Sequence, residues 1–235
     1  MCTLTVGHSA EGLIFTHNRD ESVQRGLAIA PSWHIHSGIS LLHPTDPMGG
    51  GTWWALDKQG QCAFLLNGGF EKHQRQLPYK HSRGLIPIQV LQYATIHQFV
   101  DDYSFDGLEP FTLVVHIKGF NYELVWTGEQ VHLEKLNFAH WKIWASSTLY
   151  TEEWKNARKH WLTQWLLQNT ALDAQVLWDF HHASFTADKA HDMLMERHSH
   201  LRTVSVTQIV LPFDGGEPLV RYEDRERHEE VVLKS

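Results

Sequence analysis

The second residue of the chain is a cysteine, and its position matters for chemistry. If Met1 is removed, Cys2 becomes the first residue and carries a thiol nucleophile beside a free α-amine. An α-amino group titrates at about pH 8, so part of it is neutral in the cell and can accept the proton of the thiol. The position therefore predicts a nucleophile that contains its own base. An ordinary buried cysteine is the alternative interpretation.

A polar cluster follows the first apolar segments of the chain, at Asn18-Arg19-Asp20-Glu21. It places a carboxamide, a guanidinium and two carboxylates at the end of a predicted strand. Beside Cys2, Arg19 would favour the thiolate through its positive charge, and Asp20 would hold the α-amine by a charge-assisted hydrogen bond. An exposed turn with a weak local ion pair is equally compatible with these four residues.

Asn67 ends an apolar run and is followed by two glycines. Glycine allows the backbone to turn sharply, which leaves the asparagine at an open strand edge. A carboxamide N–H can face the negative charge that develops on a carbonyl oxygen, so Asn67 is a candidate oxyanion donor. An ordinary turn asparagine is the alternative.

The chain contains 18 histidines, which raises the question of a metal. Imidazole is a common zinc ligand, but no spacing here matches a recognised zinc site and no cysteine pair assists. We therefore expect no metal, no other cofactor, and histidines that lie mostly at the surface. The second cysteine, Cys62, lies inside an apolar strand and is expected to be a core thiol. The closely spaced histidine pairs are His34 with His36, His181 with His182, and His198 with His200.

Composition limits the classes of partner. The chain has 20 Lys and Arg against 27 Asp and Glu, a formal net charge of −7. This balance provides no broad basic surface, so we expect no nucleic-acid partner and no binding to anionic membranes. No apolar stretch reaches the roughly 20 residues of a membrane helix, and the first residues do not resemble a signal peptide. With two cysteines only, we expect a soluble, cytoplasmic protein that binds a small-molecule substrate or a hydrophobic ligand; the sequence leaves its oligomeric state open.

Short apolar runs separated by turn-like spacers predict antiparallel strands. The first hairpin, 4–7 with 13–18, would bring Cys2 near the polar cluster. A second hairpin joins 52–56 to 61–67, and the stretch before it, with three prolines between 31 and 47, is expected to be irregular. The remaining predicted strands are 111–117, 122–126, 131–135, 141–146, 203–211 and 219–222, followed by a charged, solvated tail at 223–230.

Helical periodicity appears in two groups. Ser82 is a candidate cap for a helix from 83 to 93, and a shorter helix follows at 95–103. The second group comprises 151–168, 173–181 and 186–197. In the first of these helices three tryptophans recur at helical spacing and are interpreted as core: Trp154, Trp161 and Trp165.

The order of elements is strands, helices, strands, helices, strands, with no repeat and no linker. A chain of 235 residues is short enough to form one domain, so we expect a single domain over 1–235. Antiparallel sheets with grouped helices predict an α+β protein, and a four-layer αββα sandwich satisfies both features.

An ordered set of motifs resembles the NRDE family, the homologues of transport and Golgi organisation protein 2. The resemblance spans residues 1 to about 211 and implies the fold of the N-terminal nucleophile (Ntn) hydrolases, especially the choloylglycine hydrolase and penicillin V acylase group. In those enzymes a cysteine at the second position is freed by processing. The motifs are Met1-Cys2, Asn18-Arg19-Asp20-Glu21, Gly50-Gly51-Thr52-Trp53, the strand that ends at Asn67, Ser82-Arg83-Gly84, and Arg202-Thr203.

The resemblance also implies roles. Cys2 would be the nucleophile, Arg19 and Asp20 its supports, Asn67 the oxyanion donor, and Arg202 a late arginine that faces the site. One departure stands out, because the family usually has Ser-Asn where this chain has Ser146-Ser147, so a second carboxamide donor is missing and the Ser147 hydroxyl is a weak substitute. Substrate-binding or supporting positions are Asn18, Glu21, Trp53, Arg83 and Ser147.

Two functions follow as expectations. The first is an amidohydrolase that acts on a small, partly apolar amide through Cys2. The second is a carrier or chaperone without turnover for a hydrophobic metabolite, with haem or an acyl compound implied by the eukaryotic relatives. The missing carboxamide at position 147 and the ten tryptophans are compatible with the carrier. A weaker third reading is an interaction module that has kept only the fold.

Overall fold

The computed structural model describes residues 2–169, 171–198 and 200–234. Contacts divide the chain into two compact units. The first unit comprises Met1–Arg25, Phe138–Ala145 and Leu149–Ser235. The second comprises Gly26–Asn137 and Ser146–Thr148. The single domain expected from chain length remains a prediction.

In its described residues, the first unit contains a seven-stranded antiparallel sheet with the order β10-β1-β2-β12-β13-β14, and β11 pairs with β12. The predicted N-terminal hairpin is present as β1 and β2, because Leu13 pairs with His8 and continues to the Cys2–Arg19 pair. The strands are β1 (Cys2–His8), β2 (Leu13–Ser22), β10 (Lys142–Ala145), β11 (Glu196–Arg197), β12 (Leu201–Leu211), β13 (Leu219–Asp224) and β14 (Glu229–Lys234).

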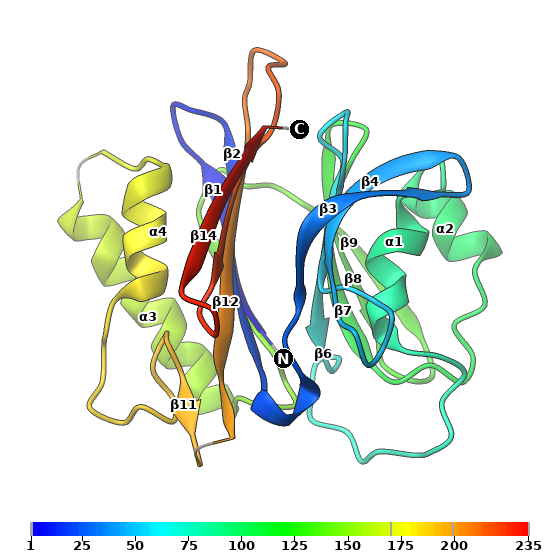
Figure 1. The fold of residues 1–235 in the computed structure, drawn as a ribbon, viewed down its shortest axis with the longest axis horizontal. Coiled ribbons are helices and arrows are strands. Elements are labelled where there is room, and N and C mark those ends of the chain that lie inside the picture. Colours follow the sequence, from blue (N-terminus) through cyan, green and yellow to red (C-terminus); the bar gives the residue numbers. More distant parts are fainter. Residues whose placement is uncertain (1, 170, 199, 235) are drawn as a thin grey trace. The chain divides into compact units, whose positions relative to one another are not determined.

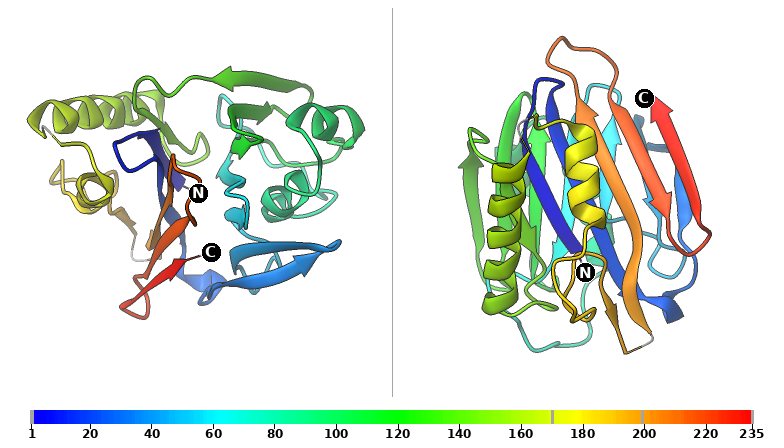
Figure 2. Two further views of the ribbon diagram at one scale, coloured as in Figure 1. Left: turned by 90° about the horizontal axis from the view of Figure 1, so that it is seen from above. Right: turned by 90° about the vertical axis from the view of Figure 1, so that its left-hand side faces the viewer.

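Two helices, α3 (Glu152–Gln168) and α4 (Ala174–His182), lie on one face of this sheet (Figures 1 and 2). Asp173 caps α4 by accepting a hydrogen bond from the Val176 backbone amide at 2.8 Å. Trp161 and Trp165 of the predicted tryptophan stripe are partly buried and pack against a cluster that includes Leu162, as expected of core side chains. Trp154 lies outside this cluster and stacks on the His191 ring. The short 3-10 helix η1 (Val23–Arg25) follows β2.

The second unit contains a seven-stranded antiparallel sheet in sequence order, from β3 to β9. The predicted hairpin of 52–56 with 61–67 is present, and the predicted strands 111–117, 122–126 and 131–135 pair in sequence order. The strands are β3 (Ile29–His36), β4 (Ile39–Thr45), β5 (Trp54–Asp57), β6 (Cys62–Asn67), β7 (Phe111–Ile117), β8 (Phe120–Trp126) and β9 (Val131–Leu136).

Helices α1 (Ile86–Val90) and α2 (Ile96–Asp102) cover one face of the second sheet (Figure 1). They bury a cluster of apolar side chains from both helices and from strands β4 to β8, and Leu113 of β7 is one of its fully buried members. The helix expected over 83–93 is shorter than predicted. Its first turn is the 3-10 helix η2 (Arg83–Leu85), which Ser82 caps through the Gly84 amide as expected, and α1 ends at Val90.

The stretch 31–47, expected to be irregular, forms the hairpin of β3 and β4. A two-residue turn at Ser37-Gly38 joins the strands, and both turn residues have positive φ, 50° and 84°. Such a turn matches the twist of paired strands. Pro31 lies where the register shifts between Ile29 and Ser32, so its missing N–H is tolerated at the irregularity.

The prediction of a helix over 186–197 is wrong. The segment consists of turns and ends in β11. Aspartate carboxylates accept hydrogen bonds from backbone amides in and next to this segment. Asp188 accepts from the Ala190 amide at 3.1 Å. Asp192 accepts from the amides of Phe185 and Met193 at 2.9 Å each. Such side-chain bonds compete with helical hydrogen bonds.

The charged tail at 223–230 is also more ordered than expected. It contains the end of β13, a turn and the start of β14, which pair from Leu219 with Lys234 to Asp224 with Glu229. Asp224 stabilises the turn by accepting from the backbone amides of Glu226 and Arg227 at 3.0 Å.

Among the helices of the described residues, none combines the length and apolar character needed to cross a bilayer.

Candidate functional site

Cys2 begins β1 of the first unit, opposite Arg19 on β2. Its side chain is buried, and burial raises the pKa of the thiol. The thiol is therefore protonated at neutral pH, so attack by its sulfur requires a base that takes the proton. The expected base is the α-amine of a trimmed chain, and Met1, whose removal this requires, lies outside the described residues.

Strand alternation separates the charged residues at this end of the sheet. Residues directly opposite each other in an antiparallel pair share a face, so Arg19 lies on the face of the Cys2 side chain. Asp20, the next residue of β2, lies on the other face. That face packs against α4, where the Thr5 hydroxyl and the His181 Nε2 atom are 2.7 Å apart.

Two hydroxyl groups hold the Asp20 carboxylate. Tyr150 donates to Oδ2 at 2.8 Å, and Thr203 of β12 donates to Oδ1 at 2.6 Å. All three side chains are buried. Burial raises the pKa of the Asp20 carboxyl above its ordinary value, and the two hydroxyl groups oppose that rise. Asp20 is thus fixed in orientation one residue beyond the Cys2–Arg19 pair.

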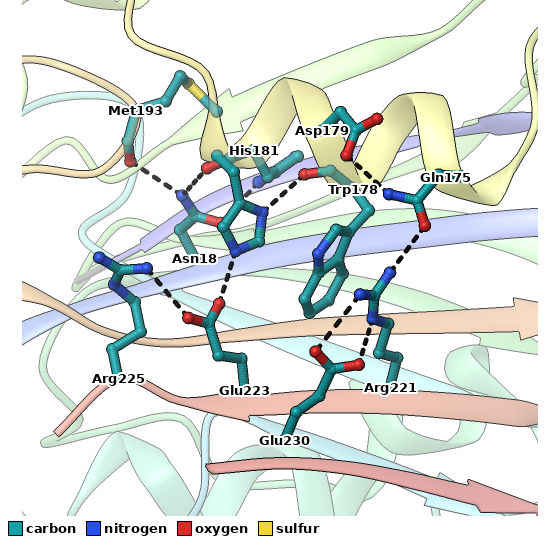
Figure 3. Close-up of polar contacts among 11 residues, drawn as sticks. Asn18, Gln175, Trp178, Asp179, His181, Met193, Arg221, Glu223, Arg225 and Glu230 are labelled. Atoms are coloured by element: carbon teal, nitrogen blue, oxygen red, sulfur yellow. Dashed lines mark hydrogen bonds and ion pairs between the residues drawn. The ribbon is translucent and has the colours of Figure 1, made fainter. Parts of the chain in front are cut away.

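Asn18 also lies on the face that packs against α4 (Figure 3). Its Nδ2 donates to the carbonyls of His181 and Met193 at 3.1 and 2.8 Å, and its Oδ1 is 2.7 Å from the His181 Nδ1 atom. Burial lowers the pKa of His181 well below its ordinary value, so the ring is neutral and Nδ1–H donates to Asn18. Asn18 therefore links both α4 and the 183–195 segment to the sheet by hydrogen bonds.

Arg202 and Glu21 occupy opposite positions on β12 and β2. The Arg202 guanidinium makes a two-pronged ion pair with Glu226, with distances of 2.7 and 2.5 Å, and it remains 44% exposed. It lines a cavity of about 250 Å³ next to Thr203. Glu21 lies 3.9 Å from Arg19 and thereby joins the charged residues on the Cys2 face.

Asn67 ends β6 of the second unit, as predicted. Its backbone carbonyl accepts a hydrogen bond from the Ser146 hydroxyl at 2.6 Å, and the next amide, of Gly68, donates to the Pro110 carbonyl at 3.0 Å. Gly68 has φ +90°, and an added Cβ would lie 3.0 Å from the Thr148 side chain. Glycine is therefore required at the turn that presents Asn67.

The Ser147 hydroxyl binds the backbone of the same turn. It donates to the carbonyls of Gly69 and Phe70 at 2.6 and 3.1 Å. A hydroxyl has one proton, so this proton would have to leave both carbonyls before Ser147 could serve as the weak oxyanion donor that the sequence suggested. In this structure Ser147 fastens the 68–70 turn.

The Gly50-Gly51-Thr52-Trp53 and Ser82-Arg83-Gly84 motifs touch each other in the second unit. The Thr52 amide donates to the Gly84 carbonyl at 2.7 Å, and a Cβ on Gly51 would lie 2.5 Å from the Gly84 carbonyl carbon. Arg83 donates to the Pro110 carbonyl at 2.8 Å and pairs with Glu109 at 3.0 Å. Trp53 is buried, and its carbonyl accepts from the Leu65 amide at 2.9 Å.

The family model described as Transport and Golgi organisation 2 matches residues 1–215. The chain belongs to this family. No protein of curated function matches the sequence.

Solved structures show which fold this member of the Transport and Golgi organisation 2 family has. It is similar to a mutant of the conjugated bile acid hydrolase from Clostridium perfringens with alanine at position 2, with a TM-score of 0.62 and 9% identity over 100% of this chain and 92% of that chain. A second variant of that hydrolase gives a TM-score of 0.63 with 9% identity over 99% and 92%. The N-acylethanolamine-hydrolyzing acid amidase ortholog of Caenorhabditis elegans gives 0.60 with 13% identity over 89% and 92%. The predicted α+β fold of the Ntn hydrolases is thus confirmed.

Two residues behind Asp20 in this family member, Tyr150 and Arg158, were not predicted from the sequence. The Arg158 guanidinium lies 3.7 Å from the centre of the Tyr150 ring and is fully buried. The missed signal was its spacing, since Arg158 follows Trp154 by four residues and precedes Trp161 by three, which places a cation on the apolar stripe of α3.

Among the described residues, no group of three or more His, Cys, Asp or Glu side chains is arranged to hold a metal ion. His34, His36 and His43 gather on the β3–β4 hairpin, where the Nε2 atoms of His36 and His43 are 2.9 Å apart. Burial lowers the pKa of His43 to about 4, so its ring is neutral at physiological pH. Cys62 is fully buried and is the core thiol that the sequence predicted.

Proposed function

We propose that this member of the Transport and Golgi organisation 2 family is an N-terminal cysteine amidohydrolase. It hydrolyses a small, partly apolar amide, with Cys2 as nucleophile and the α-amine of Cys2 as base once Met1 is removed. The observation that carries the proposal is the start of β1, where a buried thiol lies opposite Arg19 on one face of the sheet, and the next residue of β2, Asp20, is held on the other face by two hydroxyl donors.

The reaction follows from these groups. As the Cys2 sulfur attacks the amide carbon, its proton passes to the α-amine, and a tetrahedral oxyanion forms. Collapse of this intermediate breaks the C–N bond, and the ammonium gives its proton to the leaving amine. Water, deprotonated by the same α-amine, then hydrolyses the thioester. The sum is amide plus water giving carboxylic acid plus amine, and Asn67 remains the predicted oxyanion donor.

The fold supports the same class of reaction. The solved structures that resemble this chain are named as hydrolases, one of conjugated bile acids and one an acid amidase of N-acylethanolamines. Both names describe a compound with an acyl or apolar portion joined to a small polar one. A small, partly apolar amide is therefore the substrate class to test first.

The test begins with intact mass, which reads whether Met1 is removed. The protein is then treated with a thiol-directed lactam probe, and the labelled peptide is identified by mass spectrometry. We expect labelling at Cys2, hydrolysis of at least one N-acylethanolamine or conjugated bile acid, and a loss of turnover by Cys2→Ala of more than about 1,000-fold.

Cys62→Ala is the matched control, because it removes the other thiol of the chain and leaves β1 intact. Burial raises the pKa of Cys62 well above its ordinary value, so this thiol should be inert, and the variant should retain labelling at Cys2. Retention of Met1 in the purified protein, or labelling of Cys62 as fast as Cys2, would contradict the proposal.

A carrier without turnover is the second candidate. Two observations favour it: the Cys2 thiol is protonated in the untrimmed chain, and the Ser147 proton is engaged by two carbonyls. In the same experiment a carrier would bind an acyl compound or haem at one equivalent, would bind it equally in Cys2→Ala, and would hydrolyse nothing.

A further inference from the structure

Arg158 is a buried cation with an unusual set of neighbours. Its side chain is fully buried, and its terminal nitrogens donate to the carbonyls of Asp192 at 2.9 Å and Trp154 at 3.5 Å. Its Nε atom has no hydrogen-bond partner among the described residues. A buried guanidinium is expensive unless its charge is compensated, and here the compensation comes from carbonyls and aromatic faces.

The Arg158 guanidinium lies over the ring of Tyr150, 3.7 Å from its centre, and the hydroxyl of the same ring donates to Asp20 at 2.8 Å. A cation over a phenol ring draws electron density from it and makes the O–H a stronger donor. One aromatic ring therefore contacts the guanidinium through its face and the carboxylate through its hydroxyl. Residues 20 and 150 are 130 positions apart, so this contact is a product of the fold.

The surroundings of Asp20 contain few other charges. On its own strand Arg19 and Glu21 lie on the opposite face, β12 contributes the neutral Thr203, and Cys2 stands at the start of β1. Burial raises the pKa of Asp20, while Thr203, Tyr150 and then Arg158 act in the opposite direction. Arg158 is thus the cationic side chain of α3 that favours the ionised carboxylate.

We propose that Tyr150 and Arg158 are positioning residues that keep Asp20 ionised and aimed at the α-amine of Cys2. This inference rests on the proposed function. In the transfer that starts the reaction, the S–H bond of Cys2 breaks and an N–H bond forms on its own amine. Asp20 then neutralises the ammonium from one face of the sheet, and Arg19 stabilises the thiolate on the other.

The variant that tests the inference is Tyr150→Phe, which removes one oxygen and keeps the ring against Arg158. A hydrogen bond to a charged group contributes about 1.5–3 kcal/mol, so kcat/KM at pH 7 should fall about 10- to 100-fold. The acid limb of the pH profile of kcat/KM should move to higher pH, because Asp20 loses a donor that favours its ionised form. A merely structural role of the hydroxyl would leave the position of that limb unchanged.

The matched control is Tyr103→Phe in the second unit. Tyr103 is half-buried and donates to the neutral side chain of Gln89 at 2.7 Å, so the variant removes the same atom and a hydrogen bond of similar length that involves no carboxylate. We expect its pH profile to remain that of the wild type. An acid limb that moves equally in both variants would overturn the inference.

A second readout needs no substrate. The carboxyl carbon of Asp20 can be titrated by NMR in protein labelled at aspartate, with Asp20→Asn for assignment. Its midpoint should rise in Tyr150→Phe and in Arg158→Met, and Arg158→Lys should restore part of the wild-type value because the charge returns. An unchanged midpoint in Tyr150→Phe overturns the inference, even if Arg158→Met fails to fold. If the midpoint rises but the protein hydrolyses no amide, the result supports the effect of Tyr150 and Arg158 on Asp20 and contradicts the proposed function.

Discussion

The two sheets bury very different side chains. In the middle of β2 and β12 the first unit buries a continuous set of polar residues, whereas the second unit buries an apolar cluster across β4 to β8. The second unit has buried polar groups as well. Of these, Asp46 and Asp57 stabilise turns by accepting hydrogen bonds from nearby backbone amides. The mid-strand polar residues of the first unit are Thr16, His17, Asn18, Arg19, Asp20, Thr203, Ser205, Thr207 and Gln208.

This difference indicates that the two units are stabilised by different kinds of interaction. An apolar core is stabilised by burial itself, whereas each buried polar group must be matched by a partner to avoid a penalty. In the first unit individual side chains supply such partners, as Asn18 with His181 and Asp20 with Tyr150 show. Such a layer specifies orientation, which the proposed nucleophile and its supports would require.

The largest effect should come from the apolar side of the comparison. Leu113 is fully buried on β7, between Leu65 of β6 and Leu124 of β8. Leu113→Ala removes buried methyl groups and leaves a cavity, so the free energy of unfolding should fall by about 3 kcal/mol, as measured by urea denaturation. Ile35→Ala, on an exposed position of β3, should change it by about 0.5 kcal/mol or less. Equal losses in both would show that this core does not carry the stability of the unit.

A smaller loss is expected when the polar layer is broken. Asn18→Leu keeps the volume but leaves the His181 Nδ1–H and two carbonyls without their partner, at a cost of about 1–3 kcal/mol in the free energy of unfolding. The matched control is Asn121→Leu in the second unit, where Asn121 Oδ1 also lies 2.7 Å from a histidine Nδ1, that of His116. Both residues of that pair are half-buried, so water can replace the lost bond and the cost should stay below that of Asn18→Leu. A larger loss in Asn121→Leu would contradict the view that the polar layer is structural.

Local patterns made most of the strands predictable, and they also placed Cys2, Arg19 and Asp20 together. The N-terminal hairpin follows from two apolar runs and a short spacer, and its register then fixes which residues share a face. Tyr150 and Arg158 could not be assigned, because their link to Asp20 depends on where α3 packs on the sheet. The segment 186–197 was misjudged for a related reason, since aspartate side chains take the backbone amides that a helix would use.

The smallest effect should have the opposite sign. Burial raises the pKa of Asp20 above the ordinary value of about 3.9, so the folded state holds the Asp20 proton more tightly than the unfolded state does. The contribution of Asp20 to stability is therefore fully present below about pH 4 and is lost as the pH rises through the raised pKa. Asp20→Asn removes this dependence and can still bind the hydroxyls of Tyr150 and Thr203. With Met1 retained, and checked by intact mass, the variant should be more stable than the wild type at pH 7, and the difference should shrink as the pH falls towards 4. Thermal denaturation of both proteins between pH 4 and pH 7 measures this difference. If the stability of the variant relative to the wild type were lower at pH 7 than at pH 4, the ionised carboxylate would stabilise the fold, against the prediction. The predicted sign agrees with the role proposed for Asp20 toward Cys2, because the same position filled by a neutral amide would give a more stable sheet.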